Sequence, residues 1–137
     1  MAIPLLPVPV VTDGAPQPAG HYPQGMIAHG CVYISGQLPI GLEGTSFLKG
    51  SFDEQARQAI ANLLAIAKAS GSSAAQLIRV TVYIVGVENW PRFNAVYTQM
   101  LGDACPARTV VPVNDLHHGY LVEIDGIGLV GSQDDSA

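Results

Sequence analysis

The chain has 137 residues, of which 48% are hydrophobic and 12% are charged, and its formal net charge is −5. This length and apolar content predict one domain with a hydrophobic core, because two domains would each be too small to bury enough surface. Because acidic residues outnumber basic ones, no basic surface is evident that could neutralise a run of phosphates, which disfavours nucleic acid as a partner.

The N-terminal segment is rich in proline, with prolines at positions 4, 7, 9, 16 and 18. Proline lacks a backbone N–H and fixes its own φ, so we expect an extended arm over residues 1–18. The apolar part of this arm lacks a basic leader and is too short to span a bilayer, so we expect neither a signal peptide nor a membrane helix. Residues 19–131 are predicted to form the single domain, and residues 132–137 a polar tail.

A hairpin and a helix are predicted next along the chain. From Met26 to Gly36, alternating apolar residues predict two short strands that turn at His29-Gly30. After a glycine-bearing loop, residues 51–54 read Ser-Phe-Asp-Glu, which has the S-x-x-E form of a capping box. Apolar residues then recur every three or four positions, which predicts an amphipathic helix over 52–69 with Gly71 as its left-handed C-terminal cap.

The second half of the domain is predicted to hold a strand, a helix and two more strands. Residues 77–85 alternate between apolar and polar, as in a strand with one face buried under helices. Asn89 is expected as the N-cap of a second helix that ends near Gly102. Strands are then predicted over 108–113, at an edge or end because of Pro112, and over 119–130.

Two helices can cover only one face of a sheet of about five strands. If the alternation holds, the other face carries a mixture of polar and apolar side chains, too mixed for open solvent and too polar for a plain core. These residues are Arg79, Thr81, Tyr83, Glu123, Asp125, Ile127 and Leu129. We therefore expect a homo-oligomer that packs these faces together, with clefts between its subunits.

Arg108 and Glu123 are the candidate chemical groups, since each lies in an apolar strand. A guanidinium can bind a carboxylate through two parallel hydrogen bonds. A carboxylate between Val122 and Ile124 loses hydration and becomes a better proton acceptor. The pair predicts a site that binds a small acid and moves a proton; the alternative is a structural ion pair of Arg108 with Glu123 or Asp125.

Cysteine and histidine usage points away from disulfides and metals. Cys31 and Cys105 are expected to be free thiols of a cytosolic protein. The histidines are His21, His29, His117 and His118. They include no i, i+4 pair and the chain has no CxxC motif, so we expect no metal site and interpret His117 and His118 as solvated loop residues.

Several short motifs follow one another between His21 and Leu129. They are Tyr22-Pro23-Gln24-Gly25, Ile34-Ser35-Gly36-Gln37, Gln55 with Asn62, Thr81-Val82-Tyr83, Asn94 with Tyr97, Pro106-Ala107-Arg108-Thr109, and Val122-Glu123-Ile124. In order and spacing they resemble the reactive intermediate deaminase family, which is also called YjgF-like and has carried the name L-PSP endoribonuclease.

The resemblance implies a chorismate-mutase-like (YjgF-like) α+β fold: a mixed sheet with two helices on one face, assembled as a homotrimer with the other face inward. It implies active sites between subunits and hydrolysis of reactive imines or enamines to an oxo acid and ammonia, without a cofactor. The substrate would be a small carboxylate, either a 2-imino acid or an enamine acid such as 2-aminomuconate. Alternatives are a ligand-binding or chaperone-like trimer, and an endoribonuclease, which the pI of about 5.1 disfavours.

The same resemblance implies roles for individual residues. Arg108 would hold the substrate carboxylate, Glu123 would position and deprotonate water, and Tyr22 would close the pocket. The remaining implied substrate-binding positions are Ser35, Gly36, Asn94 and Thr109. The chain departs from the family pattern at His21, at Val110, where well-studied members have cysteine, and at the His117-His118 segment.

Overall fold

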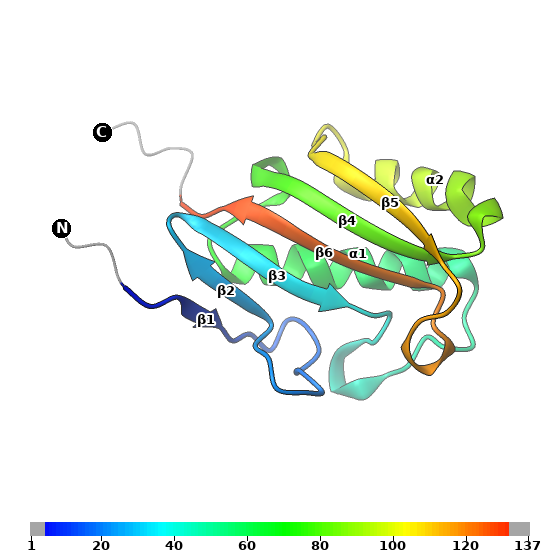
Figure 1. Ribbon diagram of the computed structural model, residues 1–137, viewed down its shortest axis with the longest axis horizontal. Coiled ribbons are helices and arrows are strands. Elements are labelled where there is room, and N and C mark those ends of the chain that lie inside the picture. The colour runs from blue at the N-terminus through cyan, green and yellow to red at the C-terminus, as the bar shows by residue number, and fades with distance from the viewer. Residues whose placement is uncertain (1–4, 132–137) are drawn as a thin grey trace.

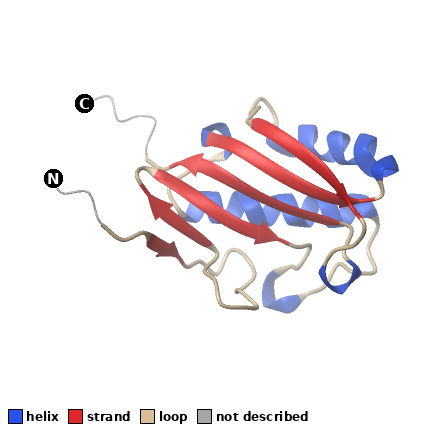
Figure 2. Cartoon of the chain, in the orientation of Figure 1, coloured by secondary structure: helices blue, strands red, loops and turns tan. Residues whose placement is uncertain are grey.

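Six strands form one mixed sheet in the order β1-β2-β3-β6-β4-β5, and two α-helices lie against one of its faces (Figures 1 and 2). The computed structural model describes residues 5–131, so the predicted tail lies outside the described residues. The elements are β1 (Val8–Val10), β2 (Gly25–Ala28), β3 (Cys31–Gln37), α1 (Phe52–Ala69), β4 (Leu77–Val85), α2 (Trp90–Leu101), β5 (Ala107–Val113) and β6 (Val122–Leu129). The β4–β5 pair is parallel and the other neighbouring strands are antiparallel. The predicted α+β fold is confirmed.

The predicted hairpin is formed by β2 and β3. Its two turn residues, His29 and Gly30, both have positive φ, at 52° and 76°. Such a turn twists in the same sense as the strands that it joins, which is why it suits a two-residue hairpin. The predicted edge position of Pro112 is also confirmed, because β5 is the last strand of the sheet.

Helix α1 begins and ends as its sequence predicts. The Ser51 hydroxyl accepts a hydrogen bond from Glu54 N (3.1 Å), and Ser51 N donates to the Glu54 carboxylate (3.4 Å), which completes the capping box. At the other end Gly71 has a φ of 83°, and Ser72 N donates to the Ala67 carbonyl (2.8 Å). This pattern satisfies carbonyls of the last turn that would otherwise lack partners.

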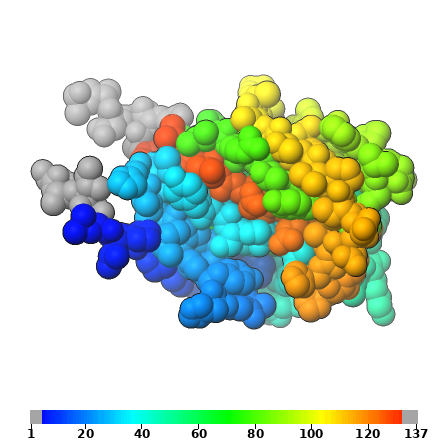
Figure 3. Space-filling view, viewed as in Figure 1, coloured from blue at the N-terminus to red at the C-terminus, as the bar shows by residue number. Residues whose placement is uncertain are grey.

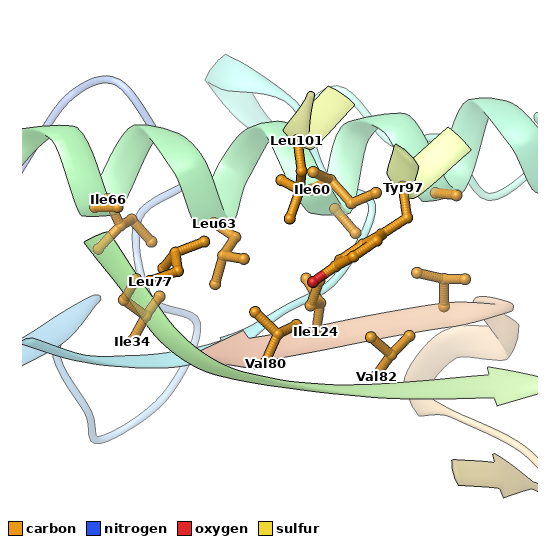
Figure 4. Close-up of a cluster of buried hydrophobic side chains, with 14 of the residues drawn as sticks. Ile34, Ile60, Leu63, Ile66, Leu77, Val80, Val82, Tyr97, Leu101 and Ile124 are labelled. Carbon is orange, nitrogen blue, oxygen red and sulfur yellow. The ribbon is translucent and has the colours of Figure 1, made fainter. Parts of the chain in front are cut away.

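The hydrophobic core lies between the sheet and the two helices (Figure 4). Fully buried aliphatic side chains from α1 face those of β4 and β6, while Tyr97 reaches from α2 toward the sheet. The labelled members are Ile34, Ile60, Leu63, Ile66, Leu77, Val80, Val82, Tyr97, Leu101 and Ile124. Each fully buried aliphatic side chain of this kind contributes about 1.5–3 kcal/mol relative to exposure. The core therefore fixes which face of each strand points away from the helices.

Asn89 occupies the predicted N-cap position of α2, but its side chain makes no cap bond, because its Nδ2 instead donates to the Val85 carbonyl (3.0 Å). One predicted strand boundary is wrong. The last strand begins at Val122 and not at residue 119, because residues 117–119 form a 3-10 turn with a φ of 62° at His118 and 86° at Gly119. Positive φ cannot be continued into an extended strand, so the strand starts only after this turn.

Part of the predicted arm lies on the domain as β1, which pairs with β2. The turn that follows β1 is bound by the buried side chain of Gln24. Gln24 Oε1 accepts from Thr12 N (2.7 Å), and Nε2 donates to the carbonyls of Thr12 (2.9 Å), Ala15 (3.2 Å) and Pro16 (3.1 Å). One side chain thus satisfies four backbone groups, which fixes the path of residues 12–16 across the domain.

Two further buried amides, on α1, bind loops at the far end of the sheet. Asn62 Nδ2 donates to the carbonyls of Leu38 (3.1 Å) and Ile40 (2.8 Å). Gln55 Oε1 accepts from Leu121 N (2.8 Å). The loop after β3 and the turn before β6 are therefore both held to the same helix.

We predict that Gln24→Ala lowers the free energy of unfolding by about 1–3 kcal/mol, because it leaves buried backbone groups without partners. Gln17→Ala is the matched control, since Gln17 is an exposed glutamine that donates one bond to the Thr12 carbonyl (3.0 Å). Urea unfolding at fixed protein concentration measures both variants. Equal losses in the two variants would contradict the role given to Gln24.

Candidate active site

One cavity of ≈ 410 Å³ lies at the end of β3, where the loop before β2, the turn before β6 and the start of β6 meet. We call it the Glu123 pocket. Of the predicted site residues it is lined by Tyr22, Ser35, Gly36 and Glu123. His117 and His118 line it as well, although the sequence led us to interpret them as solvated loop residues. A cavity of this size falls in the range of small-molecule sites.

Glu123 lies directly against the backbone of Gly36. A Cβ built on Gly36 would come within 2.6 Å of Glu123 Oε2, so a larger residue there would displace the carboxylate. The register between β3 and β6 shifts between Ile34 and Gln37, which places an irregularity of the sheet beside this contact. Such bulges re-aim side chains near functional sites. Glycine is required here by close approach, and its φ is ordinary.

The loop that carries Tyr22 is anchored to the same part of β3. Ser35 Oγ donates to the Pro23 carbonyl (2.8 Å), and Ser35 N donates to the Gln24 carbonyl (3.0 Å). Tyr22 itself is 47% exposed, so its ring lies at the mouth of the pocket and not inside the core. Ser35 therefore contributes to the pocket through the loop that it holds.

Burial raises the pKa of the Glu123 carboxyl above its ordinary value. The positive charge of His117 acts in the opposite direction, and the neighbouring Asp125 raises this pKa further. A carboxylate with a raised pKa is a stronger proton acceptor at neutral pH. The Glu123 pocket thus contains a candidate general base beside an imidazole.

A second pocket lies between the C-terminal half of α2 and the start of β5, and we call it the Arg108 pocket. Its lining includes Asn94, Tyr97, Cys105 and Arg108. The Arg108 guanidinium carbon lies 4.9 Å from the centre of the Tyr97 ring and 6.0 Å from that of Phe93. These contacts orient the guanidinium through cation–π attraction.

Two buried oxygens in the Arg108 pocket lack partners among residues 5–131. They are Asn94 Oδ1 and the Tyr97 hydroxyl. Buried polar atoms without a hydrogen bond are costly, and each such atom in a native structure requires an explanation. Burial raises the pKa of the Tyr97 hydroxyl, while the Arg108 charge lowers it, so this group stays protonated and is a free donor. A ligand or another subunit would supply the missing partners.

Arg108 and Glu123 do not come together within one chain. Arg108 pairs with Val80 and faces the helices, whereas Glu123 pairs with Tyr83 on the opposite face, and β4 lies between their strands. The alternative of an ion pair from Arg108 to Glu123 or Asp125 across the sheet is therefore wrong. Apart from Thr109, the predicted site residues fall into two sets, one in each pocket, with Asn94 in the same pocket as Arg108.

Thr109 lies in neither pocket. It is exposed on the face opposite to Arg108, and its Oγ1 accepts a hydrogen bond from Arg79 Nη2 (2.8 Å). Its hydroxyl proton is still available for a further acceptor.

The helix-free face of the sheet, seen in Figure 3, has the predicted mixed composition. Strand pairing places Arg79 opposite Ile127, Thr81 opposite Asp125 and Tyr83 opposite Glu123. None of the residues predicted for this face is buried in the single chain. Burial nevertheless raises the pKa of Asp125, although a hydrogen bond from Tyr83 and the charge of Arg79 act against that shift.

Among residues 5–131, no group of three or more histidine, cysteine, aspartate or glutamate residues could hold a metal ion. Both cysteines, Cys31 and Cys105, are free there. None of the described helices is long and apolar enough to cross a bilayer.

Comparison with known proteins gives consistent matches along most of the chain. The family model for Endoribonuclease L-PSP matches residues 12–130. A RutC family protein of Pyrococcus horikoshii is 36% identical over 118 residues, which are 86% of this chain and 94% of the relative. A 2-iminobutanoate/2-iminopropanoate deaminase of Dermatophagoides farinae is 31% identical over 121 residues, 88% of this chain and 94% of the relative. The solved structure of E. coli TdcF with bound serine has a TM-score of 0.84 and 30% identity, covering 90% of this chain and 99% of that chain.

The raised pKa of Asp125 predicts a pH-dependent effect of Asp125→Asn. The folded state binds the Asp125 proton more tightly than the unfolded state, so the charged carboxylate costs stability above both pKa values. We expect Asp125→Asn to raise the free energy of unfolding at pH 7–8. The gain should shrink as the pH falls through the raised folded pKa toward the ordinary value of about 3.9.

Urea unfolding of both proteins across this pH range, at fixed concentration, measures the gain. Asp103→Asn removes an exposed carboxylate and is the control. A gain that is independent of pH, or a loss at neutral pH, would contradict the assignment.

Proposed function

The chain belongs to the L-PSP endoribonuclease family, also called YjgF-like or Rid, and from this membership we propose that it hydrolyses reactive imines or enamines of 2-oxo acids to the oxo acid and ammonia. The observation that carries the proposal is the division of the site into two pockets. The Arg108 pocket contains a guanidinium that can bind a carboxylate, and the Glu123 pocket contains a carboxylate that can take a proton from water.

We propose that a homotrimer completes the site, with the Arg108 pocket of one subunit facing the Glu123 pocket of the next. The helix-free face supports this assembly, because its side chains are too mixed for a solvated surface and none of those predicted for it is buried in one chain. The unpartnered oxygens of Asn94 and Tyr97 support it too, since they mark the Arg108 pocket as incomplete. In a closed ring each interface would supply one complete site.

Arg108 would bind the substrate carboxylate through two parallel hydrogen bonds. In a 2-imino acid the electrophilic carbon is directly bonded to the carboxylate carbon, so fixing the carboxylate also fixes the carbon that water attacks. The rings of Tyr97 and Phe93 hold the guanidinium in one orientation, which lowers the entropy lost on binding. Asn94 Oδ1, which lacks a partner, would accept a hydrogen bond from the substrate nitrogen.

Glu123 would take a proton from the attacking water. As the O–H bond breaks, the oxygen forms a bond to the imine carbon and the C=N electron pair moves to nitrogen, which gains a proton to give a carbinolamine. In the second half of the reaction the C–N bond breaks, the hydroxyl proton leaves and nitrogen departs as ammonia after gaining another proton. A positioned base typically contributes about 10²–10⁴ in rate.

The other predicted residues would shape the cleft. Tyr22 would cover the substrate, and Gly36 leaves the space that the Glu123 carboxylate occupies. Ser35 would hold the Tyr22 loop in place. For Thr109 we propose a contact with substrate or with the neighbouring subunit through its free hydroxyl proton.

The test uses an amino-acid oxidase to generate 2-imino acids in the presence of semicarbazide, which traps the imine. We expect the protein to compete for the imine and to lower semicarbazone formation. Glu123→Gln should lower the rate by about 10²–10⁴-fold by removing the base. Arg108→Ala should lower kcat/KM by about 10²-fold or more, because a bidentate charged contact is lost.

The matched controls are Glu88→Gln, an exposed carboxylate just after β4, and Arg92→Ala, an exposed arginine of α2. Both should keep wild-type activity. Ligand binding to wild type without turnover would identify a binding protein instead of a deaminase. Equal activity in wild type and in both site variants would contradict the assignment of the site.

A further inference from the structure

The proposed reaction requires a proton carrier for nitrogen in addition to a base for oxygen. Water supplies both protons that convert the imine nitrogen to ammonia, and each leaves from oxygen. Glu123 can accept them, but every proton that it accepts must then reach nitrogen. The inference below rests on the proposed function and concerns the group that performs this second transfer.

The Glu123 pocket contains two imidazoles that the proposed mechanism does not yet use. His117 and His118 belong to the 3-10 turn at residues 117–119, and both line the pocket together with Glu123. The two neighbouring histidines differ in what they contact. The His118 ring packs edge-on against Tyr120, with centroids 6.1 Å apart, and the Tyr120 hydroxyl is hydrogen-bonded to Ser46 Oγ (2.7 Å).

The turn that carries His117 is held firmly. Tyr120 is buried, Tyr120 N donates to the His117 carbonyl (3.2 Å) and Gly119 N donates to the Leu116 carbonyl (3.1 Å). The planes of the His117 and His118 rings are inclined at 44° with centroids 6.1 Å apart, and His117 is exposed in the single chain. His117 is therefore an imidazole on an anchored turn, open to solvent and to the pocket.

Electrostatics couples His117 to Glu123. The positive charge of His117 lowers the pKa of the Glu123 carboxyl against the effect of burial. The other charged or titratable groups around the pair are His118 on the same turn, Tyr22 on the loop before β2, Asp125 on β6 and Tyr83 on β4. Of these, Asp125 raises the pKa of Glu123, so His117 supplies the opposing charge.

We propose that His117 is a further catalytic residue, the acid that delivers protons to the substrate nitrogen while Glu123 removes them from oxygen. The observation behind it is that one cavity presents a carboxylate and an imidazole that belong to one turn-and-strand unit, residues 117–123. Such a pair couples removal of a proton from oxygen to delivery of a proton to nitrogen, because a carboxylate accepts one while a protonated imidazole donates one.

The protons balance in two equivalent halves. In the addition, Glu123 takes one proton from water while the His117 imidazolium gives one to the imine nitrogen, which forms the carbinolamine. The protonated Glu123 then passes its proton to neutral His117, directly or through a water molecule, and both groups return to their starting states. In the elimination the same pair takes the hydroxyl proton and protonates the leaving nitrogen, so ammonia departs and a second internal transfer resets the pair.

The test compares His117→Gln with the matched control His29→Gln, which changes an exposed histidine of the β2–β3 turn that lines neither pocket, in the imine competition assay. We expect His117→Gln to lower kcat by about 10²-fold with little change in KM, and to remove the alkaline limb of the pH profile of kcat/KM. The acid limb should move to higher pH, because the charge that lowers the Glu123 pKa is gone. His29→Gln should leave kcat and both limbs unchanged.

His117→Lys provides a second comparison, because it keeps a positive charge at the same position. Its acid limb should stay at the wild-type pH while its alkaline limb moves upward. A readout that needs no turnover is the carbon-13 NMR titration of the Glu123 carboxyl, assigned from Glu123→Gln. We expect this titration to shift upward in His117→Gln and to keep its wild-type midpoint in His29→Gln.

An active wild type with unchanged kcat in His117→Gln would overturn the role of His117 and leave the proposed function intact. An effect of His117→Gln confined to KM would also overturn it, and would identify a substrate-binding residue. If wild type hydrolyses no imine, the proposed function fails first and the catalytic role of His117 fails with it. The three outcomes are distinguishable. Unchanged kcat and an effect on KM alone are both read in His117→Gln, whereas failure of the proposed function is read in wild type.

Discussion

The alternation of side chains along β-strands is the constraint on which the site depends. Because Arg108 aligns with Val80 and Glu123 with Tyr83, the two charged groups point to opposite faces of the sheet. No rearrangement of side chains could bring them together, since β4 lies between their strands and its inner face is buried in the core. A reaction that needs both residues therefore needs two chains, which is why the proposed function and the proposed assembly are one hypothesis.

Three buried amide side chains hold the loops around the Glu123 pocket in place. Gln24, Gln55 and Asn62 have almost no exposed surface, and each bonds backbone groups of loops that no strand ladder satisfies. Burying an amide costs free energy unless every group finds a partner, so the native loop conformations are the ones that provide partners. Those loops surround the Glu123 pocket, which Tyr22, His117 and His118 line. These three amides belong to the family motifs because they hold loops in place, and not because they take part in the reaction.

Local signals predicted most of the fold. The capping box, Gly71 and the apolar stripe gave helix α1 its observed bounds, and alternation predicted β4 and the membership of the helix-free face. These features depend on residues close in sequence. The order of the strands in the sheet could not be predicted from such signals, because the place of β6 between β3 and β4 depends on contacts between distant segments.

The candidate site was only partly predictable for the same reason. Motifs identified Tyr22, Gly36, Arg108 and Glu123, but spacing along the chain could not reveal that Arg108 faces the helices. His117 was interpreted as a solvated loop residue because its surroundings come from β3 and from the loop before β2, far away in sequence. Its position three residues before the buried Tyr120 was the one available signal that the turn is anchored and not free.

The most direct test of the two-chain site is complementation between inactive variants. Arg108→Ala and Glu123→Gln subunits would be co-expressed with different tags, and mixed trimers, verified by native mass spectrometry, would be assayed for imine hydrolysis. If each site takes Arg108 from one subunit and Glu123 from its neighbour, each mixed trimer regains about a third of wild-type activity, because one of its three interfaces has both native residues. Mixed trimers as inactive as the parent variants would contradict the account.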